Sequence, residues 1–135
     1  MDCIFCKIIH SDIPTKILKE TLHSICFLDA FPLANGHVLV IPKNHHKKLQ
    51  DMNSDENSDL FSLVHTMISK VDSITGSTLI AIHNGKNAGQ EIPHVHVHLV
   101  PRSDSDSAGP IHSMFNSALK LSESEIEKYY NLLKC

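Results

Sequence analysis

The spacing of apolar residues predicts two helices. In segment 55–71 the apolar side chains recur at helical intervals: Leu60, Leu63, Val64, Met67, Ile68 and Val71. Residues 53–55 offer cap oxygens before this segment, and Gly76 follows it as a helix stop. Segment 122–134 opens with Ser-Glu-Ser-Glu, a capping-box pattern, and carries its apolar residues on one side: Ile126, Tyr129, Tyr130 and Leu133.

Shorter runs with strand character account for much of the remaining chain. Five segments are expected as strands because they alternate or are rich in β-branched residues: 16–20, 24–28, 36–42, 78–83 and 94–100. Turn signals close the last three, namely Pro42, Asn84-Gly85 and Pro101. Five strands with two helices and mostly short connections predict an α+β fold with a mainly antiparallel sheet. We expect residues 1–135 to form one domain.

Length and charge limit the functions to consider. A chain of 135 residues can bury a core without disulfides. Its net charge is −3, with eleven Lys and a single Arg, so we expect no nucleic-acid partner. No apolar run is long enough to cross a membrane, and the N-terminus lacks signal-peptide features, so we expect a cytoplasmic protein. The N-terminal Cys-x-x-Cys pair therefore indicates a metal or redox function.

Three histidines alternate along the last expected strand. His94, His96 and His98 should share one face, about 7 Å between neighbours, while the intervening residues 95, 97 and 99 enter the core. This pattern leaves open a solvated face, a tri-histidine metal site and nucleophilic catalysis by one imidazole. A cupin-type metal site would need a Glu soon after a His-x-His pair, and residues 99–103 contain none.

The segment before these histidines favours the nucleophile. Residues 84–90 read Asn-Gly-Lys-Asn-Ala-Gly-Gln, and the two glycines allow backbone amides to approach an anion closely. Clusters of this kind are usually plain turns, but beside three histidines the loop suggests a phosphate site.

Several ordered blocks resemble the histidine triad (HIT) family, in the prokaryotic style of its Hint-like branch. They cover nearly the whole chain: Cys3-Ile-Phe-Cys-Lys-Ile-Ile9 with Ile13-Pro14, Phe27-Leu-Asp29, Gly36-His-Val-Leu-Val-Ile-Pro-Lys-Asn-His45, residues 84–90, and His94-Val-His-Val-His-Leu-Val100. The last block fits the triad motif, in which three histidines alternate with hydrophobic residues.

The resemblance implies a nucleotide hydrolase. His96 corresponds to the nucleophile that attacks the α-phosphorus and forms a transient nucleotidyl-histidine. His98 corresponds to a phosphate contact and His37 to another catalytic histidine. Positions that correspond to nucleotide contacts are Asp29, Asn84, Gly89 and Gln90, beside His96 and His98. At the position of a phosphate-contacting Ser in animal relatives this chain has Glu91, to which we assign no role.

The resemblance leaves three activities open. We expect hydrolysis of a nucleoside phosphoramidate, with a purine nucleotide as the most favoured ligand. The alternatives are hydrolysis of dinucleoside polyphosphates and a regulatory nucleotide-binding protein whose hydrolysis is incidental.

A metal site and a dimer are also implied by the resemblance. Cys3, Cys6, His45 and His94 correspond to the ligands of a zinc knuckle. Two thiolates and two imidazoles suit tetrahedral zinc with no open position, which indicates a structural ion. A metal-free knuckle of reduced cysteines is the alternative. The resemblance further implies a homodimer in which the helix at 55–71 pairs across a two-fold axis.

Overall fold

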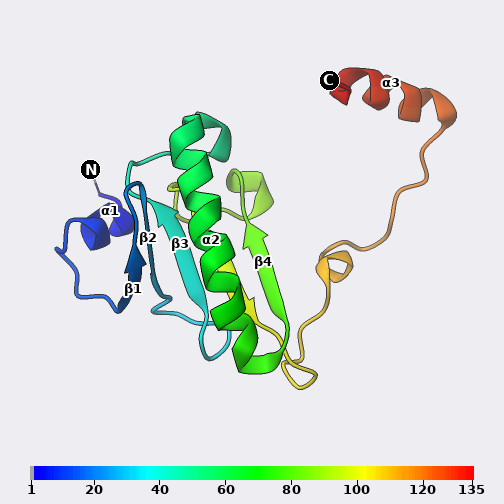
Figure 1. The fold of residues 1–135 in the computed structure, drawn as a ribbon. Coiled ribbons are helices and arrows are strands. Elements are labelled where there is room, and N and C mark those ends of the chain that lie inside the picture. Colours follow the sequence, from blue (N-terminus) through cyan, green and yellow to red (C-terminus); the bar gives the residue numbers. More distant parts are fainter. Residues whose placement is uncertain (1) are drawn as a thin grey trace.

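A computed structural model describes residues 2–135 and contains a five-stranded sheet with three α-helices (Figure 1). The strands are β1 (Ile17–Glu20), β2 (Ser24–Leu28), β3 (Val38–Pro42), β4 (Thr78–Ile82) and β5 (Val97–Pro101). The helices are α1 (Ile4–Ile9), α2 (Ser54–Thr75) and α3 (Glu123–Leu133). The predicted α+β class, the five strands and the two longer helices are confirmed.

The sheet has the strand order β1-β2-β3-β5-β4, and every neighbouring pair is antiparallel. β3 lies at the centre, where Val40 is paired with Cys26 of β2 and Leu39 with His98 of β5. α2 runs across one face of the sheet, and α1 lies near the β1 end (Figure 1).

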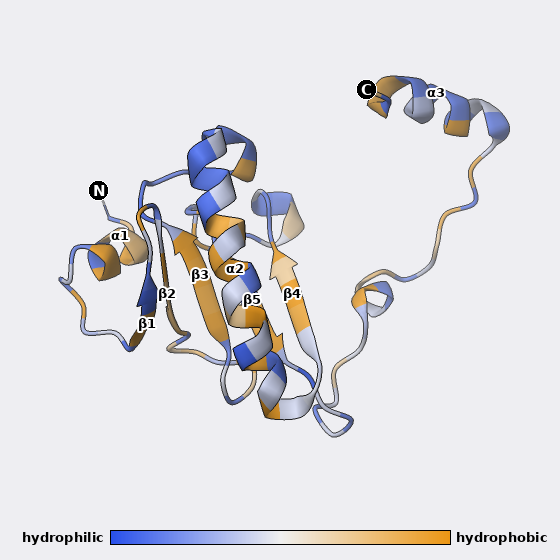
Figure 2. Cartoon of the chain, in the orientation of Figure 1, coloured by the Kyte–Doolittle hydropathy of each residue, from blue (hydrophilic) through white to orange (hydrophobic). Residues whose placement is uncertain are grey.

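Alternate residues of the central strands enter two separate cores. Val38 and Val40 pack with α2, whereas Leu39 and Ile41 pack with Phe5 and its neighbours of α1. A strand that is buried on both faces needs an uninterrupted apolar sequence, and β3 is accordingly hydrophobic along its length (Figure 2). The face opposite α2 is therefore free to carry a site beside the smaller core.

The ends of α2 follow the predicted signals. Asn53 accepts a hydrogen bond from the amide of Glu56, and the Glu56 carboxylate in turn accepts one from the Asn53 amide, which completes a capping box. Gly76 ends the helix with φ of +89°, in the left-handed region that glycine adopts without strain. The predicted apolar stripe is buried against the sheet, except for the half-buried Ile68.

Two expectations need correction. The prediction of two helices missed α1, because six residues are too few to show a helical period; α1 owes its place to the burial of Phe5 and Ile8. The last strand begins at Val97 rather than at residue 94, because the Val95 amide bonds to the carbonyl of His46 in a loop and not to a strand. The alternation of faces nevertheless holds: Val95 and Val97 both lie in the core beneath α2.

The C-terminal part has a different character. No residue of 103–135 is buried, and α3 lies away from the sheet at the end of an extended segment (Figure 1). α3 has the predicted capping box at Ser122 and Glu125, while the large apolar residues of its predicted side are all exposed. None of the helices within residues 2–135 combines the length and apolar character needed to cross a membrane.

Candidate active site and metal centre

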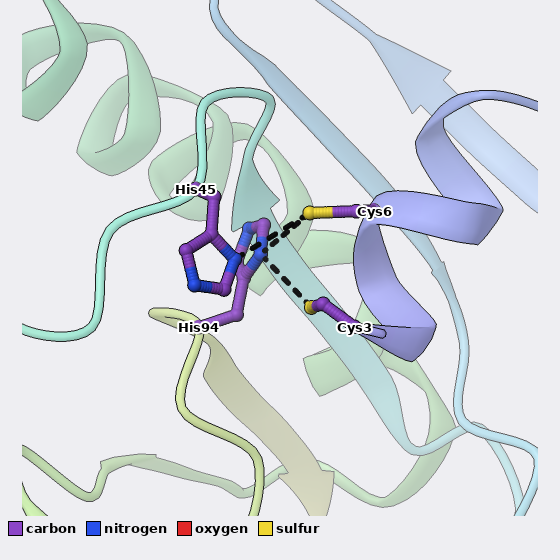
Figure 3. A group of neighbouring side chains, drawn as sticks. All are labelled: Cys3, Cys6, His45 and His94. Carbon is purple, nitrogen blue, oxygen red and sulfur yellow. Dashed lines mark hydrogen bonds between the residues drawn. The ribbon is translucent and has the colours of Figure 1, made fainter. Parts of the chain in front are cut away.

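Two cysteines and two histidines converge near the N-terminus (Figure 3). Cys3 and Cys6 come from α1 and its N-cap, His45 from the loop after β3, and His94 from the segment before β5. One side-chain donor atom from each residue lies within 4.8 Å of all the others. The four predicted ligands, of which the first and last are 91 positions apart in the sequence, are thus brought together.

The distances in this cluster suit zinc. Sγ of Cys3 lies 3.5 Å from Nδ1 of His94, and Sγ of Cys6 lies 3.4 Å from Nδ1 of His45 and 3.7 Å from Nδ1 of His94. A sulfur at about 2.3 Å and a nitrogen at about 2.0 Å from a tetrahedral zinc ion are roughly 3.5 Å apart. The residues present therefore fit a zinc ion.

The tautomer of His94 agrees with this fit. Its Nε2 lies 2.9 Å from the carbonyl oxygen of Pro42, and a carbonyl oxygen only accepts hydrogen bonds. Nε2 therefore carries the proton, and Nδ1 presents its lone pair to the two cysteines. A backbone carbonyl behind a metal-binding imidazole is the usual arrangement that orients such a ligand.

A cavity of about 620 Å³ opens beside this cluster, on the face of the sheet opposite α2. Its volume is in the range of small-molecule sites. One part of its wall is apolar and includes Ile8, Phe27, Phe31 and Leu33. The polar part includes two carboxylates and four imidazoles: Asp29, Glu91, His37, His83, His96 and His98.

A directional hydrogen-bond chain fixes the protons of two of these histidines. The Leu33 amide donates to Nδ1 of His37 at 3.0 Å, so a neutral His37 carries its proton on Nε2. That Nε2 lies 2.9 Å from Nδ1 of His98 and donates to it. His98 is then left with a proton on Nε2. The chain thereby makes Nε2 of His98 a donor for a ligand.

His96 carries its proton on the other ring nitrogen, Nδ1, than His98 does. Its Nδ1 lies 2.7 Å from the carbonyl oxygen of His94 and must be the donor, which leaves Nε2 with a lone pair. The ring lines the cavity, and its Nε2 has no protein partner among residues 2–135. His96 therefore offers a bare nitrogen where the neighbouring His98 offers an N–H, with the two ring centres 5.0 Å apart.

The environment keeps these imidazoles neutral. Burial lowers the pKa of His96 below the usual imidazole value, and the hydrogen bond to the His94 carbonyl only partly opposes this. Burial, with the neighbouring imidazoles, lowers the pKa of His98 to about 4. Burial also lowers the pKa of His37, although Asp29 lies 3.5 Å from its Nε2. A neutral His96 is the form that can act as a nucleophile.

The geometry does not support a tri-histidine metal site. Among the described residues, no group of metal-binding atoms within 4.8 Å combines His94, His96 and His98. Asp29, His37 and His98 do form such a group. A metal on Nε2 of His37, however, would require the proton on Nδ1, where the Leu33 amide already donates. The hydrogen-bond chain accounts for this second group better than an ion does.

The expected loop residues occupy different places. Gly89 lines the histidine cavity, but Asn84 and Gln90 do not. The Asn84 side chain accepts from the Leu49 amide and donates to Gln50, so it holds a neighbouring turn. The Gln90 side chain accepts from the Gly85 amide, which closes the loop on itself, and donates to the carbonyl of residue 47, which ties the loop to the segment after β3. Asp29 lines the cavity, where its carboxylate accepts from the Phe31 amide.

Sequence reasoning missed two contributors to the site. His83 lines the cavity with its ring centre 5.6 Å from that of His98. It directly precedes the glycine loop, and this position was the available signal. Phe5 packs its ring edge-to-face against His94 and His96, with centres 5.7 and 5.1 Å apart. The short helix α1 therefore packs against both the Cys/His cluster and His96.

Comparison with known proteins gives a consistent result. The HIT domain family matches residues 10–105. An adenosine 5'-monophosphoramidase of Saccharomyces cerevisiae is 44% identical over 105 residues, which cover 78% of this chain and 65% of that protein. An uncharacterized HIT-like protein of Methanocaldococcus jannaschii is 39% identical over 106 residues, which cover 77% of this chain and 81% of that protein.

A solved structure has the same fold over nearly its whole length. The histidine triad nucleotide-binding protein of Candida albicans superposes with a TM-score of 0.84 at 32% identity. The superposition covers 98% of this chain and 95% of the other. The match therefore includes the β-sheet, the two histidine-bearing segments and the C-terminal region.

Proposed function

Because the chain belongs to the HIT family, we propose that it hydrolyses nucleoside phosphoramidates, with a purine nucleoside as the favoured substrate, through a nucleotidyl-histidine intermediate. We also propose that it is a Hint-like member with a structural zinc ion. The similarity to an adenosine 5'-monophosphoramidase supports the choice of reaction. The observation that carries the proposal is the bare Nε2 of His96 in the cavity beside the N–H of His98.

In the proposed first step, Nε2 of His96 attacks the α-phosphorus and forms a P–N bond. The bond from phosphorus to the leaving nitrogen breaks, and the amine departs with that electron pair and a proton from solvent. His96 then carries a positive charge, which the carbonyl of His94 stabilises through the 2.7 Å hydrogen bond from Nδ1. A covalent step of this kind replaces one difficult displacement by two easier ones.

In the second step, water attacks the same phosphorus and gives up a proton to solvent, and the P–N bond to His96 breaks. His96 regains its lone pair, and the nucleoside monophosphate is released. Throughout both steps, the N–H of His98 donates to a phosphate oxygen whose charge develops in the transition state. His37 contributes to catalysis as a positioning residue. Its Nε2–H donates to Nδ1 of His98 and so holds His98 in the tautomer that donates from Nε2.

The rest of the cavity would hold the nucleoside. Phe31 and Leu33 are 84% and 78% exposed, so they present apolar surface on which a purine could stack. Asp29 lies between this wall and the histidines, where its carboxylate would accept hydrogen bonds from ribose hydroxyls. Gly89 leaves room for a phosphate beside His83.

Zinc in this proposal is structural. Cys3, Cys6, His45 and His94 would supply all four ligands, so the ion has no open position for substrate. Its contribution is to fix His94, whose carbonyl in turn orients the nucleophile His96.

Replacement of the nucleophile tests the proposal. The turnover of adenosine phosphoramidate by His96→Ala should be lower than that of the wild type by on the order of 10⁴-fold or more, because the covalent path is lost. Affinity for AMP, measured by titration calorimetry, should change far less, since few ground-state contacts are removed. Acid quenching during turnover should trap a nucleotidylated protein only in the wild type.

An exposed histidine provides the matched control. His65→Ala, on the outer side of α2, should keep wild-type turnover. Wild-type turnover in His96→Ala would disprove the assignment of the nucleophile. If the wild type binds AMP tightly but hydrolyses neither adenosine phosphoramidate nor a dinucleoside polyphosphate, the result favours a regulatory nucleotide-binding protein over an enzyme.

A further inference from the structure

A second hollow, of about 700 Å³, adjoins the histidine cavity. Its lining is Lys47, Lys48, Gly85, Lys86, Gly89, Gln90, Glu91 and Pro93. We call it the lysine groove. Gly89 and Glu91 line both the groove and the histidine cavity, so one ligand can extend from the first into the second.

The charge of the groove is opposite to that of the chain. Three ammonium groups face a single lining carboxylate, although the whole protein has a net charge of −3. None of these lysines forms an ion pair with any residue in the described part of the chain. Lys48 reaches the loop, where its Cε would lie 3.3 Å from a side chain added at Gly85. Unpaired cations in a concave site attract anions.

The backbone of the loop offers less to an anion than its glycines suggest. The amides of residues 88, 89 and 90 donate to the carbonyls of Gly85 or Lys86, and the Gly85 amide donates to the Gln90 side chain. These donors are already used within the loop. An anion in the groove would therefore be bound by lysine side chains.

We propose that the lysine groove is a subsite for an oxyanion, a phosphate or a sulfate, carried by the leaving group of the substrate. The proposal rests on the proposed function, which places the scissile phosphorus beside His96. For substrates with such a leaving group, unlike the phosphoramidate, attack by Nε2 of His96 forms the P–N bond and breaks the bond from phosphorus to a bridging oxygen. The leaving group departs with that electron pair as an oxyanion, which needs no proton from a general acid. The three ammonium groups stabilise the charge that it gains.

Glu91 acquires a role in this proposal. It is the only carboxylate in the groove lining, and it stands where the groove meets the histidine cavity. A carboxylate at that point repels an anionic leaving group and tolerates an uncharged amine. Glu91 thereby reduces the preference for anionic leaving groups that the three lysines create.

Substrates with different leaving groups test the proposal. The variant Lys47→Gln/Lys48→Gln/Lys86→Gln is compared with the wild type on diadenosine tetraphosphate, adenylyl sulfate and adenosine phosphoramidate. Exposed charge pairs each change an equilibrium by a factor of roughly 1.5 to 5, so kcat/KM for the first two substrates should fall about ten-fold. The phosphoramidate, whose leaving group is ammonia, should change little. The relative losses on tetraphosphate and sulfate show which oxyanion the groove prefers.

Two further variants sharpen the result. Lys19→Gln/Lys70→Gln/Lys120→Gln removes the same charge from exposed positions outside both hollows and should leave all three substrates unaffected. Glu91→Gln should act in the opposite direction and raise kcat/KM for the anionic substrates. Equal losses on all three substrates in the groove variant, or no loss on any, would overturn the proposal.

A binding measurement separates this proposal from the proposed function. Titration calorimetry with inorganic tripolyphosphate needs no turnover, and the groove variant should bind this probe about ten-fold more weakly than the wild type. If the wild type hydrolyses the phosphoramidate but both proteins bind tripolyphosphate equally, the subsite is wrong and the function stands. If the wild type hydrolyses nothing while the groove variant has lost tripolyphosphate binding, the function is wrong and the anion site stands.

Discussion

At the scale of single residues, backbone groups determine what each imidazole can do. The carbonyl oxygens of residues 42 and 94 keep the protons of His94 and His96 on Nε2 and Nδ1, respectively. The Leu33 amide donates to Nδ1 of His37 and so keeps the proton of that ring on Nε2. One histidine is thereby suited to a metal, one to attack and one to orient a donor. The same side chain obtains three chemical roles because its neighbours differ, not because its own chemistry changes.

Burial of these histidines predicts a stability that depends on pH. In the unfolded chain an imidazole gains its proton near pH 6.5, but burial lowers the pKa of folded His98 to about 4. Between these values the unfolded state binds more protons, so the free energy of unfolding decreases as the pH falls from about 6.5 towards 4. The slope from one such histidine is at most about 1.4 kcal/mol per pH unit, and it is smaller for the half-buried His98.

Denaturant unfolding at about pH 7.5, above the usual imidazole pKa, and at about pH 6 and 5, below it, would measure this effect. His98→Asn should show a shallower decrease in stability than the wild type, because it removes one titrating group. His112→Asn, at an exposed position, should keep the wild-type slope. Since the four proposed zinc ligands are the same in all three proteins, identical slopes would contradict the burial argument.

At the scale of elements, α1 depends on the rest of the molecule. Six residues do not form a stable helix alone, and this helix lacks a side-chain cap at Cys3. Phe5 and Ile8 are buried, and burial of such side chains contributes about 1.5–3 kcal/mol each. The four-ligand cluster would add a second attachment between α1 and the segments after β3 and before β5.

We therefore predict that the purified protein contains about one zinc ion per chain and that the ion stabilises the fold. Cys3→Ser/Cys6→Ser should lose the metal. At a free zinc concentration 100-fold above the dissociation constant, the expected loss of stability is about 2.7 kcal/mol. Elemental analysis after chelator-free purification and thermal unfolding measure the two effects.

The terminal Cys135 gives the control for zinc binding. Cys135→Ser removes an exposed thiol far from the cluster and should change neither the zinc content nor the unfolding temperature. Unchanged zinc in the double cysteine variant would refute the ligand assignment. A wild type without zinc would favour the metal-free knuckle of reduced cysteines.

At the scale of the whole molecule, several apolar surfaces remain exposed, among them parts of β4 and of α3. β4 is an edge strand whose Leu79 and Ile80 are 41% and 45% exposed. α3 also exposes its apolar side. The apolar stripe of α2, by contrast, packs on the sheet of its own chain, so this stripe is not available to pair across a two-fold axis. An exposed apolar edge strand readily pairs with another chain.

The homodimer in which α2 pairs across a two-fold axis stays a prediction; such pairing would use the side of α2 that faces away from the sheet, and we expect the β4 edge to take part as well. Light scattering at micromolar concentration should give twice the chain mass of 15.0 kDa. Ile80→Lys should shift the mass towards the monomer, because a buried ammonium group at the interface is costly. Leu22→Lys replaces a residue that is 78% exposed at the other end of the sheet and should keep the dimer. A monomeric wild type would end the idea.

Sequence alone was sufficient for the features that depend on near neighbours. The apolar period of α2, its cap at Asn53 and its stop at Gly76 follow from residues within a few positions, since helical hydrogen bonds and caps are local. Alternation along residues 94–99 likewise predicted which side chains enter the core, because a strand-like backbone turns successive side chains to opposite faces. The motif resemblance supplied the four residues of the Cys/His cluster, which lie together as expected.

Only the tertiary structure decided how the chemistry is arranged. The proton on His94 is placed by the carbonyl of Pro42, 52 residues away, and that on His37 reaches His98 across 61 residues. The position of His83 in the cavity and the meeting of Lys47 with Lys86 depend equally on contacts between distant segments. Periodicity records the environment of a residue only along its own element, whereas tautomers, pKa values and pockets depend on groups that folding brings within hydrogen-bond or Coulomb range.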